Sequence, residues 1–190
     1  MSHPLYILNI VSQDHPGIVA SVSAAVYDLG GNIESCSQTV LDGYFTFILV
    51  VSFSEPLEPD ELSLRIKQYG ILQQENYKLI VLPISGDLKK NSQNNGSDLF
   101  VITAFGKDRP GVIKNISKYL ADKKINIVDF YSRCENSEFT MVGQVEIPSW
   151  LDLHQLQDDM EDLGRELEFT IKLQHNNIFV ATNELRLHGN

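Results

Sequence analysis

The sequence predicts an α+β protein with two ferredoxin-like (βαββαβ) domains in tandem, each an antiparallel sheet with helices on one face. Three observations lead to this prediction. The chain repeats itself at a constant separation, a polar segment lies between the two copies, and strand-like and helix-like patterns alternate in the same order within each copy.

The repeat has a period of 94 residues, which is the separation of Asp108 from Asp14. The same shift, without any gap, continues to the end of each copy. It aligns Asp14 with Asp108, Pro16 with Pro110, Gly17 with Gly111, Asn32-Ile33 with Asn126-Ile127, Phe45-Thr46 with Phe139-Thr140, and Lys78-Leu79 with Lys172-Leu173. A register kept over such a length indicates an internal duplication, with each unit about the size of a small domain.

The domain boundaries follow from this repeat. We expect a first domain over 1–85, a linker over 86–97, a second domain over 98–176 and a C-terminal helix or tail over 177–190. The linker is rich in Asn, Ser and Gly, so it cannot bury apolar surface and is typical of a flexible or exposed segment. Apolar residues of the tail (Ile178, Ala181 and Leu185) are expected to dock on the body of the protein or on a partner.

Each copy begins with a short apolar strand, 5–11 or 99–105, rich in β-branched residues. Apolar residues then recur at helical spacing: Ile18, Val22, Val26 and Leu29 in the first copy, and Val112, Ile116 and Leu120 in the second. Gly30-Gly31 predicts the end of the first of these helices.

Two strands follow in each copy, at 32–41 and 44–53, and again at 126–134 and 139–147. Asp42-Gly43 predicts a hairpin turn between the first two strands. A second helix and a last strand, 77–84 or 169–175, complete the order. The second helices carry Leu62, Ile66 and Tyr69 in one copy and Leu156, Met160 and Leu163 in the other.

Composition excludes several classes of function. The net charge of −10 and pI near 4.8 argue against direct nucleic-acid binding, which needs clustered cations. No apolar run approaches the roughly 20 residues of a membrane span, and the first ten residues lack a signal-peptide pattern, so we expect a cytoplasmic protein without membrane contact. Cys36 and Cys134 show no CxxC spacing and are expected to be reduced, partly buried thiols.

The segment between the first strand and the first helix carries the candidate chemistry. Asp14 and Asp108 are expected to cap the helix, with Pro16 and Pro110 in its first turn. At Gly17 and Gly111 the absent side chain would let another group approach the free helix N–H groups, which favour a carboxylate. Asn32 and Asn126 could then present amide groups to a nearby ammonium, although capping and tight packing alone also explain these residues.

The segments "DHPGIVASVSAAVYDLGGNIESCSQTVLDGYFTFILVVSF" and "DRPGVIKNISKYLADKKINIVDFYSRCENSEFTMVGQVEI" each resemble an ACT domain, a small regulatory module that binds amino acids. The resemblance covers nearly the whole chain apart from the linker and the extreme termini. As a tandem pair with the ending "QHNNIFVATNEL", the chain is similar to the glycine cleavage system transcriptional repressor family.

The resemblance implies a ligand pocket, commonly at an interface between ACT units. The implied positions are Asp14, His15, Pro16, Gly17, Ile18, Asn32 and Ile33 in the first copy and Asp108, Arg109, Pro110, Gly111, Val112, Asn126 and Ile127 in the second. Because His15 stands where the second copy has Arg109, the two sites need not be equivalent, and one could be purely structural.

The resemblance also implies a non-catalytic, repressor-like regulator that acts through a protein partner, forms a homo-oligomer (a dimer first) and uses a small amino acid as effector, without metal or cofactor. Two alternatives stay open: a ligand-free ACT-type interaction module, and a regulatory subunit of an amino-acid biosynthetic enzyme such as acetohydroxyacid synthase. An enzyme is disfavoured, because the chain has no recognised catalytic motif and the second copy replaces His15 with Arg109, which cannot act as a base.

Overall fold

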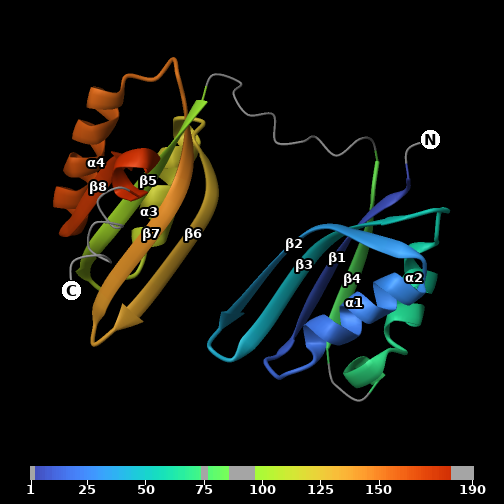
Figure 1. Ribbon diagram of the computed structural model, residues 1–190. Coiled ribbons are helices and arrows are strands. Elements are labelled where there is room, and N and C mark those ends of the chain that lie inside the picture. The colour runs from blue at the N-terminus through green and yellow to red at the C-terminus, as the bar shows by residue number, and fades with distance from the viewer. Residues whose placement is uncertain (1–2, 74–76, 86–96, 181–190) are drawn as a thin grey trace. The chain divides into compact units, whose positions relative to one another are not determined.

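The computed structural model describes residues 3–73, 77–85 and 97–180, and it divides into two compact units, Met1–Lys90 and Asn91–Asn190 (Figure 1). The division falls within the predicted linker. That linker lies outside the described residues except for Ser97, where the first strand of the second unit begins.

The first unit contains a four-stranded antiparallel sheet of order β2-β3-β1-β4. Its elements are β1 (Leu5–Gln13), α1 (Ile18–Asp28), β2 (Gly31–Leu41), β3 (Tyr44–Phe53), α2 (Pro59–Ile66), a short 3₁₀ helix (Gly70–Gln73) and β4 (Lys78–Ile84). The predicted order is confirmed. Tyr69, expected within the second helix, lies just beyond its end.

The second unit repeats this topology with the order β6-β7-β5-β8. Its elements are β5 (Ser97–Lys107), α3 (Val112–Asp122), β6 (Asn126–Glu135), β7 (Glu138–Pro148), α4 (Leu153–Leu167) and β8 (Phe169–His175). A further helix begins at Asn176, and its described part ends at Val180; we call residues 176–180 the C-terminal helix. Ala181 and Leu185 of the predicted tail lie outside the described residues.

The hairpins close with two-residue turns in which both residues have positive φ. Asp42 and Gly43 have φ of 49° and 80°, and Asn136 and Ser137 have φ of 53° and 64°. These angles match the twist of antiparallel strands, so the predicted turn at Asp42-Gly43 is confirmed. A bulge interrupts the register at the same place in both units, between Ile33 and Ser35 and between Ile127 and Asp129.

Each unit has its own core between the sheet and its two helices. Leu8, Leu49 and Leu62 are fully buried in the first unit, and Ile102, Ile116 and Met160 are nearly so in the second. Alternate residues of every strand therefore face the helices, and the others form an outer face of each sheet, on the side away from the helices.

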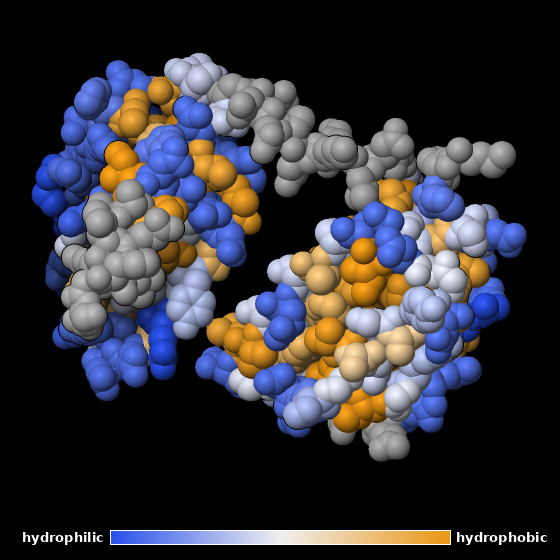
Figure 2. Space-filling model, in the orientation of Figure 1, coloured by the Kyte–Doolittle hydropathy of each residue, from blue (hydrophilic) through white to orange (hydrophobic). Residues whose placement is uncertain are grey.

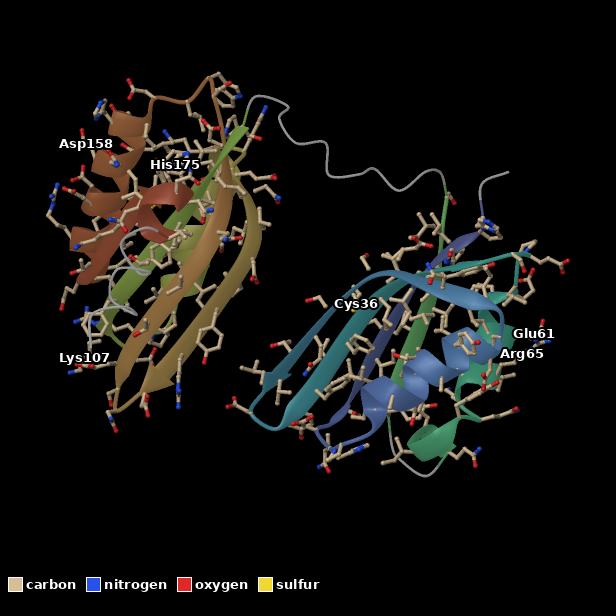
Figure 3. The ribbon with its side chains drawn as sticks, in the orientation of Figure 1. Cys36, Glu61, Arg65, Lys107, Asp158 and His175 are labelled. Atoms are coloured by element: carbon tan, nitrogen blue, oxygen red, sulfur yellow. The ribbon has the colours of Figure 1, made fainter. Side chains whose placement is uncertain are left out.

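The two cysteines are free, as predicted, but both are exposed rather than partly buried. The reason is their position: Cys36 lies on β2 (Figure 3) and Cys134 near the end of β6, and these are the edge strands of the two sheets. Within the described residues, no helix has the length and apolar character that crossing a membrane requires.

Candidate functional site

The turn between the first strand and the first helix has the same geometry in both units. Gly17 and Gly111 are the N-cap residues, with φ of 102° and 96°, in the left-handed region that side chains rarely adopt. Neither helix has a side-chain cap. Glycine is therefore required by the backbone conformation of this turn.

The predicted capping roles of the aspartates and prolines are wrong. The backbone N–H groups of Asp14 and Asp108 donate to the carbonyl oxygens of Gly43 and Ser137, at 2.8 and 2.9 Å, so these residues tie the turn to the hairpin tip beside it. The prolines precede the N-cap glycine, outside the first helical turn. With the left-handed glycine as the N-cap, the aspartates lie three residues and the prolines one residue before the capping position.

The space beside these glycines is open. A Cβ placed on Gly17 would meet only the side chain of Ile71, at 4.0 Å, and one on Gly111 only the Asn115 amide, at 4.0 Å. The first intrahelical bonds are those from Ser21 N to Gly17 O and from Asn115 N to Gly111 O. The preceding helical N–H groups have no acceptor within the helix, and together with the helix dipole they favour an anion.

The two turns differ in the groups around them. Arg109 forms an ion pair with Glu168, and this hydrogen bond and charge lower the pKa of the Glu168 carboxyl. Partial desolvation, together with the hydrogen bond and charge of Asp108, raises the pKa of the Cys134 thiol. The second turn is thus held by neighbouring charged and polar side chains.

In the first unit, His15 stands at the position that Arg109 has in the second unit. Its Nδ1 lies 3.2 Å from the carbonyl oxygen of Pro16. Its Nε2 is covered, and within the described residues it has no hydrogen-bond partner. The sequence difference between His15 and Arg109 is therefore also a difference in how the two turns are held.

Asn32 and Asn126 do not lie beside the turns of their own units. Asn32 pairs with Ser52, which pairs with Leu5 at the start of β1, whereas Asp14 follows the end of β1. At about 3.3 Å per residue, the two lie roughly 30 Å apart along the sheet. A single unit therefore does not assemble the predicted set, and the binding roles of these residues stay predictions.

Both asparagines instead lie beside a carboxylate that the sequence analysis missed. Asn32 Nδ2 donates to Glu34 Oε1 at 3.2 Å, and Ser52 Oγ donates to the same oxygen at 2.6 Å. These bonds, that from Ser52 first, lower the pKa of Glu34. In the second unit Asn126 Nδ2 donates to Glu146 Oε2 at 3.3 Å.

The carboxylate comes from a different strand in each unit, β2 for Glu34 and β7 for Glu146. At the 94-residue shift, Glu146 aligns with Ser52 and Glu34 with Val128, so neither glutamate is repeated in sequence. The signal that could have found them is the strand pairing, which places Asn32 opposite Ser52 and Asn126 opposite Glu146.

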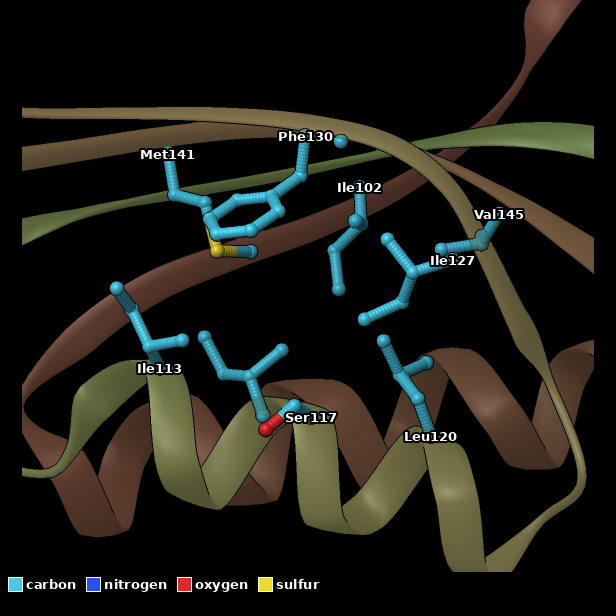
Figure 4. Close-up of a pocket in the computed structure, with 10 residues that line it drawn as sticks. Ile102, Ile113, Ser117, Leu120, Ile127, Phe130, Met141 and Val145 are labelled. Carbon is cyan, nitrogen blue, oxygen red and sulfur yellow. The ribbon is translucent and has the colours of Figure 1, made fainter. Parts of the chain in front are cut away.

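The apolar members of the predicted set have structural roles. Ile18 and Val112 are 2% and 3% exposed and belong to the two cores. Ile33 packs on the core of the first unit. Ile127 lines a cavity of about 50 Å³ between α3 and the sheet of the second unit, together with Ile113, Ser117 and Phe130 (Figure 4).

This cavity is almost wholly apolar, with the Ser117 hydroxyl as the only polar side-chain group among its lining residues. It offers no counterpart for the charges of a free amino acid. It is therefore a packing gap of the core rather than the predicted ligand pocket.

The ACT domain model matches residues 5–68 and 98–174, one segment in each unit, and these segments hold both turns and both asparagines. The chain belongs to the ACT domain family. One matched segment lies in each of the two βαββαβ units; the first ends before β4 and the second runs into β8, so this is a tandem ACT protein.

Single-unit relatives resemble part of this ACT protein. A UPF0237 protein of Methanococcus maripaludis is 39% identical over 80 residues, which are 42% of this chain and 89% of that protein. Another, of Corynebacterium diphtheriae, is 51% identical over 49 residues, 26% of this chain and 55% of that protein.

The tandem arrangement also has a solved counterpart. The crystal structure of a "putative glycine cleavage system transcriptional repressor" superposes with a TM-score of 0.65 and 18% identity, over 92% of this chain and 98% of that one. At this identity the likeness shows a shared fold.

Proposed function

We propose that this tandem ACT protein is a non-catalytic regulator that binds a free amino acid. One observation carries the proposal: in both units, a left-handed glycine opens an uncapped helix N-terminus with unpaired N–H groups. Such a terminus suits the α-carboxylate of an amino acid.

The α-ammonium needs acceptors, and the asparagine–glutamate pairs supply them. Glu34 beside Asn32 and Glu146 beside Asn126 combine a carboxylate with an amide oxygen. Because each pair lies far from the turn of its own unit, a pocket that uses both must draw on two ACT units. The proposed ligand is a small amino acid such as glycine or serine.

The regulatory output is proposed to pass through a protein partner in the cytoplasm, in a repressor-like role. Two points support this. The tandem fold is shared with the repressor-type structure named above, and a net charge of −10 disfavours direct contact with nucleic acid. The ligand would shift the equilibrium between two packings by the difference in its affinity for them.

Calorimetric titration with a panel of free amino acids tests the proposal. A sensor of this kind is expected to bind in the micromolar to millimolar range, or roughly −8 to −4 kcal/mol. Saturable heat for one or two amino acids supports it. No saturable heat for any of them would leave a ligand-free interaction module.

The matched variants are Val19→Glu and Ile113→Glu, since both residues are exposed, at 42% and 41%, one position after the first helical residue. A glutamate there stabilises the helix N-terminus while its charge competes with the ligand's carboxylate. Val19→Gln and Ile113→Gln are the matched controls, because glutamine has nearly the shape of glutamate but carries no charge. Binding that weakens with Glu and not with Gln would locate the carboxylate at that turn.

A further inference from the structure

The outer face of the first unit's sheet is a feature that ligand binding does not explain. The pairing of the strands shows which residues share this face. The residues on β1 are Ile7, Asn9 and Val11, and their neighbours across the sheet include Ile48 and Val50 of β3 and Ile80 and Leu82 of β4. Of these, Ile48, Ile80 and Leu82 are 41%, 50% and 53% exposed. Figure 2 shows hydrophobic surface around the tip of the β2–β3 hairpin, where this face ends.

Charge is confined to two corners of this face. Lys78 lies opposite Val11 on the edge strand β4, and Glu34 lies at the bulge of the other edge strand, against Ser52. Along β2 the residues between are Ser35, Ser37 and Thr39, which pair with Val50, Ile48 and Thr46. The middle of the face is therefore uncharged.

The outer face of the second unit has a different character. Its sheet positions carry both signs of charge: Lys107, Asp129, Arg133, Glu135, Glu138, Glu146 and Lys172. The C-terminal helix also lies over it, because Phe179 and Val180 line one groove with Val101 and Val142. Val101 is 2% exposed, although it faces away from α3 and α4.

Asn9 lies in the middle of the first unit's face, between Ile48 and Ile80. Its Oδ1 is covered, and no described residue donates to it. The first unit itself closes off this oxygen, so only the Nδ2 group of Asn9 is open to a partner. An amide donor in an apolar row needs an acceptor, and the hydroxyl groups of Ser35, Ser37 and Thr39 on the same face of a second copy can supply one.

We infer that the outer face of the first unit, centred on Asn9, is a dimer interface that binds the same face of a second copy of this chain. Two copies of a chain with a net charge of −10 repel each other, so they associate most easily through an uncharged face. The polar side chains in its middle are an amide and hydroxyls, which carry both a donor and an acceptor, so the face is complementary to itself.

The face is large enough for such an interface. Four strands of about eight residues cover roughly 500 Å² in plan, and the relief of the side chains raises the accessible area towards the ~800 Å² per partner of a standard interface. An area at the lower end of this class corresponds to a reversible dimer. The inference concerns a surface and does not depend on amino-acid binding.

Sedimentation equilibrium of the full chain, over about 1–100 µM, tests the inference. The mass is expected to rise towards twice 21.4 kDa with concentration. Val11→Lys and Ile48→Lys are each expected to raise the dissociation constant at least about tenfold, because like charges would meet across the interface. Phe105→Lys, the residue at the position of Val11 in the second unit and 49% exposed, is the matched control and should leave it unchanged.

An equimolar mixture of Ile48→Lys and Ile48→Glu chains identifies self-association. Opposite charges beside Asn9 should restore a mixed dimer that neither chain forms alone. A wild-type chain that stays monomeric at every concentration, a dimer that all the lysine variants keep, or a mixture that stays monomeric would each overturn the inference. Circular dichroism of each variant separates these outcomes from misfolding.

Discussion

The two units share the βαββαβ order, the strand order, the two-residue hairpin turn and the bulge, yet their sheets differ on both faces. On the core side, Leu49 beside Cys36 in the first unit corresponds to Gly143 beside Phe130 in the second. A Cβ atom on Gly143 would stand 3.2 Å from the Cβ atom of Phe130, so the larger side chain is on β3 in the first unit and on β6 in the second. The outer faces also differ, one being apolar and the other charged and covered by the C-terminal helix.

The largest expected effect tests the difference between the core-facing sides of the two sheets. Leu49→Ala removes a fully buried side chain and should cost about 2–5 kcal/mol of unfolding free energy. Gly143→Ala, at the same register position in the other unit, adds a methyl group 3.2–3.3 Å from Phe130 and Ile102, and should cost about 1 kcal/mol. Urea titration measures both, and equal costs would contradict this difference.

The next largest effect concerns the left-handed glycine that precedes the first helix in both units. Gly17→Val and Gly111→Val should each destabilise their own unit by about 1–3 kcal/mol, because valine is strained at φ near +100°. The cost comes from the backbone angle and not from a clash, because the space beside both glycines is open. Two urea titrations with no change in midpoint would show that the turn relaxes without this glycine.

A smaller effect is expected at the helix N-terminus of both units. Val19→Glu and Ile113→Glu should each stabilise their unit by about 0.3–1 kcal/mol in low salt, since both helices lack an acidic residue in the first turn. The gain should disappear in high salt. Thermal unfolding at two salt concentrations measures it, with the glutamine variants as controls.

The smallest effect is a pH dependence that arises at the turn of the second unit. Because Arg109 lowers the folded-state pKa of Glu168, this pair stabilises the fold above the unfolded pKa, and the stabilisation is lost as the pH falls through the lower folded value. NMR titration of Glu168 should show its pKa return to the ordinary value in Arg109→Gln. An unchanged pKa would show that the ion pair does not form in solution.

The fold could be predicted almost completely, since a 94-residue repeat and two periodicities specify topology. The helix caps could not be predicted from the sequence. The φ angle of Gly17 decides where the helix begins, and composition does not determine that angle. The separation of Asn32 from the turn could have been predicted: α1 returns the chain to the opposite end of the sheet before β2 begins.

Other features depend on tertiary contacts. The exposure of Cys36 and Cys134 follows from edge positions in the strand order, which local pattern does not give. The pairs of Asn32 with Glu34 and Asn126 with Glu146 depend on register across strands. The contrast between the two outer faces does not appear in the middle of the central strands β1 and β5, where the alternate residues are Ile-Asn-Val and Val-Thr-Phe. It lies in the neighbouring strands, where Ser35 and Ser52 of the first unit correspond to Asp129 and Glu146 of the second.

The central claim is that an amino acid's carboxylate binds at a glycine-opened helix N-terminus. Following the backbone amides of Gly17–Ala20 and Gly111–Lys114 by NMR during amino-acid titration tests it most directly. The account predicts saturable shifts at one or both turns for a small amino acid, and their loss in the matching glutamate variant. Saturable binding that leaves both sets of amides unmoved, or no binding by any amino acid, would contradict it.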